Sequence, residues 1–102
     1  YPCHQFVGEE AFKLGDIYTG VTNKKIQDEF ASCNVYARKE CADCWARLYC
    51  SGGCAANAYH ATGSVKGVYK EGCELFCKRL ECALAVAIIR DMKENSHEDA
   101  DC

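Results

Sequence analysis

The stretch that decides the fold is CADCWARLYCSGGC, residues 41–54, in which four cysteines follow the spacing Cys-x2-Cys-x5-Cys-x3-Cys. A fifth cysteine, Cys73, lies downstream. Thiolate is the ligand that iron–sulfur clusters, zinc and copper(I) prefer. Gly52 and Gly53 let the backbone pass close to the sulfurs and turn through conformations that other residues resist. The pattern therefore predicts a soft-metal site and favours an iron–sulfur one.

Composition is consistent with this prediction. The chain has 102 residues, enough for one domain with a modest core, and ten are cysteines, as in a disulfide scaffold or a metal protein. Metal is favoured because half of the cysteines have ligand-type spacing, no hydrophobic signal stretch opens the chain, and a long apolar helix is predicted. A metal–thiolate protein implies a reducing compartment, so we expect a cytoplasmic location.

Charge and hydropathy exclude several partners and activities. The net charge of −3 provides no basic surface for nucleic acid. The longest apolar run, residues 82–89, is too short to span a membrane, so we expect no membrane partner. No glycine-rich phosphate loop and no Ser–His–acid spacing are present, so neither nucleotide chemistry nor hydrolysis is predicted.

Local signals predict an α+β fold. It is a small metal-stabilised domain over residues 1–93, with an N-terminal β-hairpin, a short helix, cysteine-rich loops and a long C-terminal helix. The hairpin is expected from strands at Tyr1–Val7 and Phe12–Tyr18. Thr22-Asn23 is expected to cap a helix at 24–32, with Ile26 and Phe30 on one face. A shorter helix is predicted at 55–61, ending at Gly63.

The C-terminal third is predicted to be a helix over roughly residues 73–93, preceded by Gly72. Its apolar residues recur at three- and four-residue steps, which predicts that this stripe packs in the core; they are Leu75, Phe76, Leu80, Ala83, Leu84, Ala87 and Ile88. Residues 94–102 contain four acids and no large apolar side chain, and are predicted to be a disordered tail.

The cysteine pattern resembles that of SPASM domains, the C-terminal extensions of radical S-adenosylmethionine enzymes that typically hold two auxiliary 4Fe-4S clusters. The stretches YPCHQFVG at 1–8, CWARLYCSGGCAAN at 44–57 and GCEL at 72–75 narrow the resemblance to the maturases of SCIFF peptides. Those enzymes form thioether cross-links in a cysteine-rich precursor peptide. The resemblance, over roughly residues 1–90, implies electron transfer and substrate-peptide engagement, with the parent enzyme's radical S-adenosylmethionine barrel and the peptide as partners.

The resemblance also implies which residues bind the one or two clusters. The second auxiliary cluster would be bound by Cys41, Cys44, Cys50 and Cys73, and the first by Cys3 and Cys54. Ligands interleaved in this way tie the hairpin, the loop and the helix together, so metal binding is expected to be linked to folding.

The chain departs from the family pattern in the hairpin. The family has Cys-x9–15-Gly-x4-Cys there; Cys3 and Gly15 fit, but the next position is Gly20, so the first cluster lacks one thiolate. Cys33 is a candidate substitute, the alternative being a thiol at a helix end. SCIFF-type maturases share the gap, which would leave an iron open to a substrate sulfur.

The radical-generating motif is also missing. That motif is Cys-x3-Cys-x2-Cys, and the nearest run, Cys73-x3-Cys77-x4-Cys82, is one residue too long and lies on a predicted helix. The parent would be a radical maturase, but this chain is not expected to be catalytic alone.

Other interpretations remain open at the level of sequence. Four thiolates also suit a structural zinc or single-iron site, and a secreted disulfide-linked binding protein is a third alternative. Cys77 and Cys82 are predicted to be small buried hydrophobic residues rather than ligands, and Cys102 a free thiol in the tail. Trp45 and Tyr49 are expected either to shield a cluster or, more ordinarily, to belong to the core.

Overall fold

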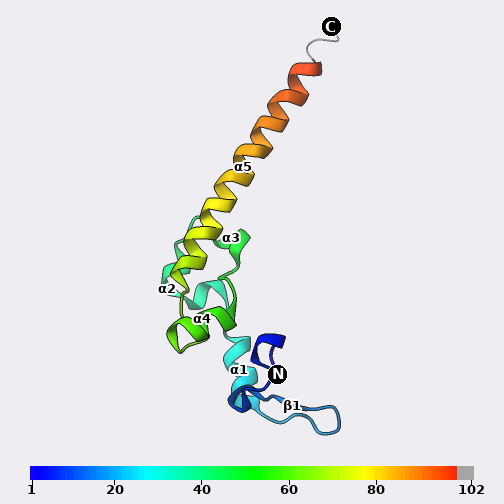
Figure 1. The fold of residues 1–102 in the computed structure, drawn as a ribbon, viewed down its shortest axis with the longest axis vertical. Helices are drawn as coiled ribbons and strands as arrows, with labels where there is room; N and C mark the ends of the chain where they lie inside the picture. The colour runs from blue at the N-terminus through cyan, green and yellow to red at the C-terminus, as the bar shows by residue number, and fades with distance from the viewer. Residues whose placement is uncertain (99–102) are drawn as a thin grey trace. The chain divides into compact units, whose positions relative to one another are not determined.

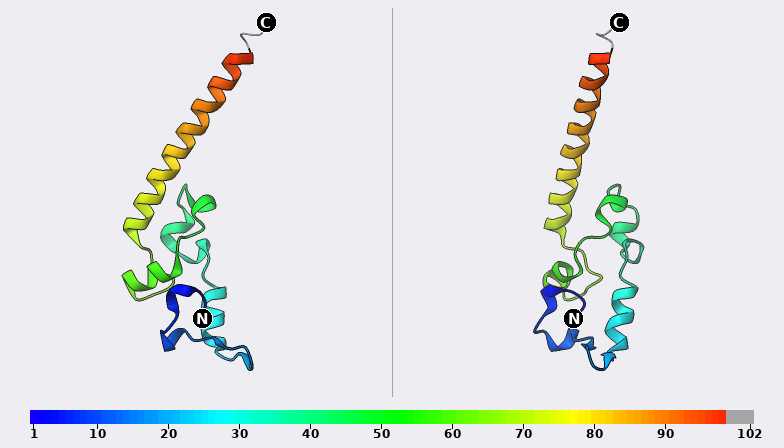
Figure 2. Two further views of the ribbon diagram at one scale, coloured as in Figure 1. Left: turned by 45° about the vertical axis from the view of Figure 1, so that its right-hand side comes forward. Right: turned by 90° about the vertical axis from the view of Figure 1, so that its right-hand side faces the viewer.

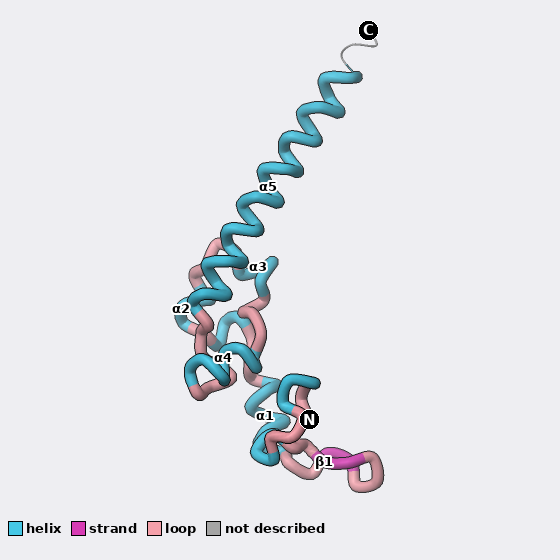
Figure 3. The backbone as a smooth tube through the Cα atoms, in the orientation of Figure 1, coloured by secondary structure: helices cyan, strands magenta, loops and turns pink. Residues whose placement is uncertain are grey.

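The computed structural model describes residues 1–98 and divides the chain into two compact units. The N-terminal unit is Tyr1–Tyr69, and the C-terminal unit begins at Lys70 (Figure 1). Helices and loops make up nearly all of the described chain, with one pair of short strands (Figure 3). A two-stranded hairpin is present, at other residues than predicted, and so is the predicted long C-terminal helix.

The chain begins with two 3-10 helices, η1 (His4–Phe6) and η2 (Glu10–Phe12). Each ends on a buried phenylalanine, and the Phe6 and Phe12 rings stack with centroids 4.1 Å apart. The predicted strand at Tyr1–Val7 is therefore wrong. A strand alternates its side chains between two faces, whereas these tight turns direct both rings into one core.

The hairpin itself is shorter than predicted and lies further along the chain. Strand β1 (Gly15–Asp16) pairs antiparallel with β2 (Gly20–Val21), in the register Gly15↔Val21 and Asp16↔Gly20. The Asp16 carboxylate accepts hydrogen bonds from the backbone N–H groups of Tyr18 (2.8 Å) and Thr19 (2.9 Å). These bonds, the one from Thr19 first, lower the pKa of that carboxyl. A side chain at position 15 would collide with the Gly20 carbonyl, so only glycine permits this strand pairing.

Two predicted helices are confirmed, α1 (Lys24–Ala31) and α4 (Ala55–Thr62). The Asn23 side chain caps α1 by accepting a hydrogen bond from the Ile26 N–H at 3.3 Å. Gly63 ends α4 with a φ of +80°, in the left-handed region that glycine tolerates.

These helices and the two 3-10 turns enclose what we call the phenylalanine core. Its buried members are Phe6, Phe12, Ile26, Ala56 and Val65, with Phe30 and Tyr59 packed against them. Phe30 and Tyr59 meet the stacked phenylalanines edge-on, an arrangement that aromatic pairs favour. The core therefore joins the first thirty residues to α4 and the loop that follows it.

Residues 33–54, which we call the cysteine segment, connect α1 to α4. They form only single turns: η3 (Val35–Ala37), α2 (Lys39–Ala42) and α3 (Arg47–Cys50). The Asn34 side chain begins η3 by accepting from the N–H groups of Tyr36 and Ala37. The segment agrees with the predicted cysteine-rich loops, although its loops contain short helical turns.

The C-terminal unit is helix α5 (Lys70–Glu98), unbroken in both views of Figure 2. It begins before the predicted start and includes Gly72. It also continues past the predicted end at residue 93, so residues 94–98 of the predicted disordered tail are helical. Side-chain contacts at helical spacing, such as Lys78–Glu81 at 2.6 Å, support it. Residues 99–102, including Cys102, lie outside the described residues.

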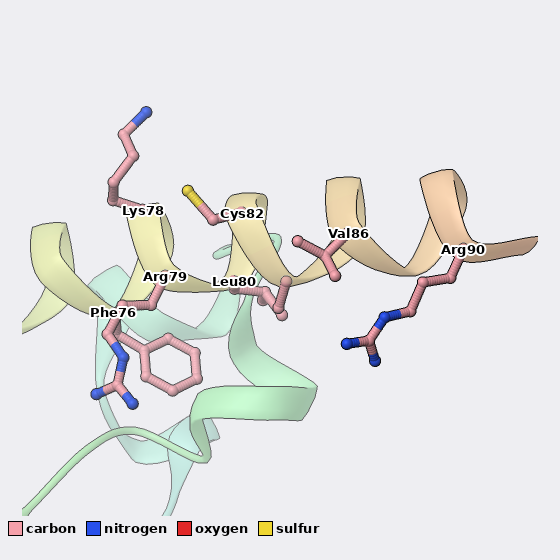
Figure 4. A pocket seen from close by; sticks show the side chains of 8 residues that line it. Phe76, Lys78, Arg79, Leu80, Cys82, Val86 and Arg90 are labelled. Atoms are coloured by element: carbon pink, nitrogen blue, oxygen red, sulfur yellow. The ribbon is translucent and has the colours of Figure 1, made fainter. Parts of the chain in front are cut away.

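The apolar stripe of α5 was predicted to be core, but residues 81–97 are all exposed. Ile88 is 59% exposed, and Cys82, predicted to be buried, is exposed as well. A single helix cannot bury its own side chains. The periodicity of the sequence identifies an apolar face, but it does not show that another element covers that face. A shallow groove along this helix is lined by residues including Phe76, Leu80 and Val86 (Figure 4).

Candidate metal centre

Three of the four residues predicted to bind the second cluster lie within two successive turns of the cysteine segment. Cys41 is in α2, Cys44 follows it, and Cys50 is the last residue of α3. Backbone hydrogen bonds close these turns, from Cys44 N–H to Cys41 O (3.1 Å) and from Cys50 N–H to Ala46 O (2.9 Å). All three thiols are half-buried. The local fold thus keeps this part of the ligand set together.

The surroundings of Cys41 change the acidity of its thiol. Partial burial raises the pKa of the Cys41 thiol, because it disfavours the charged thiolate. The positive charge of Arg38 opposes that rise, whereas the nearby thiols of Cys44 and Cys50 add to it. A raised pKa keeps Cys41 protonated at neutral pH, so a metal that binds there has to displace a proton.

The loop after α3 has the conformation that the two glycines predicted. Ser51, Gly52 and Gly53 have φ angles of +55°, +91° and +75°, three successive residues with positive φ. Cys54 then stands at the N-terminus of α4 in extended conformation. The backbone therefore turns between Cys50 and Cys54 through left-handed angles that the two glycines adopt without strain, with Ser51 also in the left-handed region.

Cys3 and Cys54, which were predicted to bind the first cluster, are distant in sequence but lie on segments that contact each other. Cys3 begins η1, is half-buried and packs against the phenylalanine core. The Cys54 thiol donates a hydrogen bond to the Gln5 side chain at 3.1 Å. Since Gln5 follows Cys3 by two residues, the N-terminal turn and the start of α4 meet at this point.

Cys33 and Cys73 are placed differently from the others. The Cys33 thiol donates to the Val65 carbonyl at 3.2 Å and accepts from the Arg38 guanidinium at 3.2 Å. Cys73 lies in the first turn of α5, in the C-terminal unit. The predicted ligands of the second cluster are therefore divided between the two units.

The donor type fits a soft metal, but the sulfurs are not gathered around a centre. Within residues 1–98 no group of three or more His, Cys, Asp or Glu side chains is arranged to hold a metal ion. The thiols of the N-terminal unit carry no disulfide; they are Cys3, Cys33, Cys41, Cys44, Cys50 and Cys54. These are the ligands that an iron–sulfur cluster or zinc takes, and binding would require their sulfurs to converge.

The cysteine segment differs from an ordinary core in what it buries. Trp45 is 53% exposed and Tyr49 is 66% exposed, so the expectation that they belong to the core is wrong. Trp45 precedes α3 and Tyr49 lies within it, and this helix of a single turn presents too little surface to cover an indole or phenol ring. In this segment the buried side chains are Arg38 and Ala46. Sequence reasoning missed Arg38, because nothing in the spacing distinguishes it from a surface arginine.

No protein-family model matches the chain, and no curated protein matches it. Among the helices of residues 1–98, none combines the length and the apolar character needed to cross a membrane.

Proposed function

We propose that the chain is an auxiliary 4Fe-4S-cluster-binding domain of a radical S-adenosylmethionine enzyme that cross-links a peptide through thioethers. One observation carries the proposal. Residues 41–54 of the cysteine segment hold four cysteines at ligand-type spacing, yet the buried side chains of the segment are only Arg38 and Ala46. A segment of this kind needs a source of order other than an apolar core.

The energetics favour metal as that source. Ordering a residue's backbone costs about 1–2 kcal/mol, and the single turns of this segment bury little apolar surface in return. Structural zinc contributes about 10–16 kcal/mol in finger peptides, which shows the scale that thiolate ligation can reach. This binding should be pH-dependent, because a thiol must lose its proton to bind metal, and the raised pKa of Cys41 adds to that dependence.

The proposed ligands are those that the resemblance to SPASM domains implies. Cys41, Cys44, Cys50 and Cys73 would hold the second auxiliary cluster, and Cys3 and Cys54 would contribute to the first. A bound cluster would supply one-electron transfer. The contact between Cys54 and Gln5 supports the first pair, since it brings the turn that contains Cys3 to α4.

The exposed side chains suggest where partners would bind. Trp45, Leu48 and Tyr49 place apolar surface beside the ligands, suited to a cysteine-rich precursor peptide. Along α5 the uncharged run 82–89 is exposed on every side, suited to burial against the barrel of the parent enzyme. The reducing cytoplasm, where thiols persist, is the proposed location.

Anaerobic reconstitution with iron and sulfide tests the proposal. We expect about four irons and four sulfides for each cluster, with a paramagnetic resonance signal after reduction. Cys44→Ala should lose the second cluster, whereas Cys82→Ala, a matched change at an exposed cysteine outside the ligand set, should keep it. A folded protein that binds no sulfide would refute the proposal.

A structural zinc or single-iron site is the second candidate. It is favoured by the same four thiols, since four thiolates complete a tetrahedral zinc site. Native mass spectrometry separates the two, because one zinc adds a single metal mass and no sulfide.

A further inference from the structure

Arg38 is the buried charged side chain of the described chain, with 3% of its surface exposed. Its guanidinium donates through Nη2 to the Val65 carbonyl at 2.7 Å and to the Cys33 sulfur at 3.2 Å. Through Nη1 it donates to the Gly52 carbonyl, within the loop between Cys50 and Cys54. One side chain therefore joins the end of α1, the glycine loop and the loop after α4.

Burial of this charge is costly, which makes its contacts informative. A buried guanidinium is normally matched by a carboxylate, yet the acceptors here are two carbonyls and a thiol sulfur. Its Nε has no partner among the residues that the structure describes. A guanidinium at the surface would not carry this cost. The buried position is therefore explained by the hydrogen bonds through which the rigid, forked guanidinium joins three separate segments.

The guanidinium of Arg38 packs closely against the backbone of Gly52, where the absence of a side chain leaves room for it. A Cβ at position 52 would lie 2.5 Å from Nη1 of Arg38, and the residue has a φ of +91°. Gly53 also has a positive φ, but a Cβ there would meet no atom within 4 Å. Both glycines thus adopt a positive φ, but only at position 52 would an added side chain collide with Arg38.

We infer that Arg38 is a positioning residue for the metal centre and that Cys33 belongs to its hydrogen-bond network rather than to the ligand set. The guanidinium sets the path of the loop that carries Cys50 and Cys54. The Cys33 thiol is engaged on both sides, donating to Val65 and accepting from Arg38. The inference rests on the proposed function only in taking Cys50 and Cys54 as ligands.

The metal affinity of the whole 102-residue chain, measured by competition with a chelator, tests the inference. Outer-shell partners typically change metal affinity by about 10- to 100-fold, and we expect a loss of that order in Arg38→Lys and Arg38→Gln, because neither side chain provides the fork. Gly52→Ala should weaken binding more than Gly53→Ala, which serves as the matched control for backbone strain. Cys33→Ala should keep the wild-type metal count, unlike Cys44→Ala. Loss of metal in Cys33→Ala, or wild-type affinity in both Arg38 variants, would overturn the inference.

Thiol reactivity in the metal-free protein gives a second reading that does not depend on a cluster. Alkylation of Cys33 should speed up in Arg38→Lys, while alkylation of Cys3, packed against the phenylalanine core, should stay at the wild-type rate. An unfolded variant would instead speed up both. If the wild type bound no metal, the proposed function would fail, and unchanged Cys33 reactivity in Arg38→Lys would separately refute the network.

Discussion

The phenylalanine core and the cysteine segment belong to the same unit but are ordered by different means. The core buries Phe6 completely and surrounds it with Phe12, Phe30 and Tyr59. The cysteine segment leaves its own aromatic rings exposed. It is held by backbone turns and by the buried fork of Arg38.

The difference shows that apolar burial can explain the order of the phenylalanine core but not that of the cysteine segment. Ring packing stabilises the core whether or not metal is bound. Single turns are weak by themselves, because helix nucleation is unfavourable and each turn forms few bonds. The cysteine segment should therefore depend on metal, and the core should not.

The largest expected effect separates the two regions directly. Removing metal from the reconstituted protein with a chelator should expose the amides of residues 33–54 to hydrogen exchange, while α1 and α4 stay protected. The scale is set by the roughly 10–16 kcal/mol that structural zinc supplies in finger peptides. Mass spectrometry measures this exchange. An equal rise in exchange in both regions, or no change in either, would contradict the proposed difference between them.

The next effect breaks the core instead. Phe6→Ala should destabilise the protein by about 3–5 kcal/mol, because it leaves a cavity among stacked rings. Tyr18→Ala is the control, since that ring is 92% exposed, and should change stability by less than about 0.5 kcal/mol. Urea unfolding at constant metal load measures both. Equal effects of the two substitutions would show that the rings do not form the core.

A smaller effect tests one local signal that supports the core. Asn23→Ala should cost about 1 kcal/mol by removing the cap of α1, whereas Asn23→Ser should retain most of the stability. Both are read from thermal unfolding followed by circular dichroism. A serine variant as unstable as the alanine variant would mean that the asparagine acts through something other than capping.

The smallest effect concerns the hairpin, which lies outside both regions. Because hydrogen bonds from Thr19 and Tyr18 lower the pKa of Asp16, its contribution is present above the ordinary carboxyl pKa. That contribution is lost as the pH falls through the lowered pKa of the folded state. The carbon-13 shift of the Asp16 carboxyl, followed against pH, measures this pKa. An ordinary carboxyl pKa would show that the hydrogen bonds of the turn do not stabilise the carboxylate.

Features governed by neighbours in the sequence were predictable. Asn23 before α1 and Gly63 after α4 mark helix ends through contacts with residues only a few positions away. The positive φ angles at Gly52 and Gly53 follow from the same kind of local rule.

Features that depend on distant contacts were not predictable. The N-terminal residues favour a strand by composition, yet burial of Phe6 against Phe12 and Tyr59 selects two tight turns. The apolar period of α5 is real, but Ile88 and its neighbours remain exposed, because a period cannot say whether a covering surface exists.

By itself, the sequence determined where α1 starts and where α4 stops, which turns require glycine, and which thiols have the spacing of ligands. Each of these follows from short-range sterics and hydrogen bonding. Tertiary structure alone decided that Arg38 is buried, that Cys33 contacts it, and that the turn of Cys3 meets α4 at Cys54. These contacts join residues from separate segments, and only the folded chain brings their atoms within bonding distance.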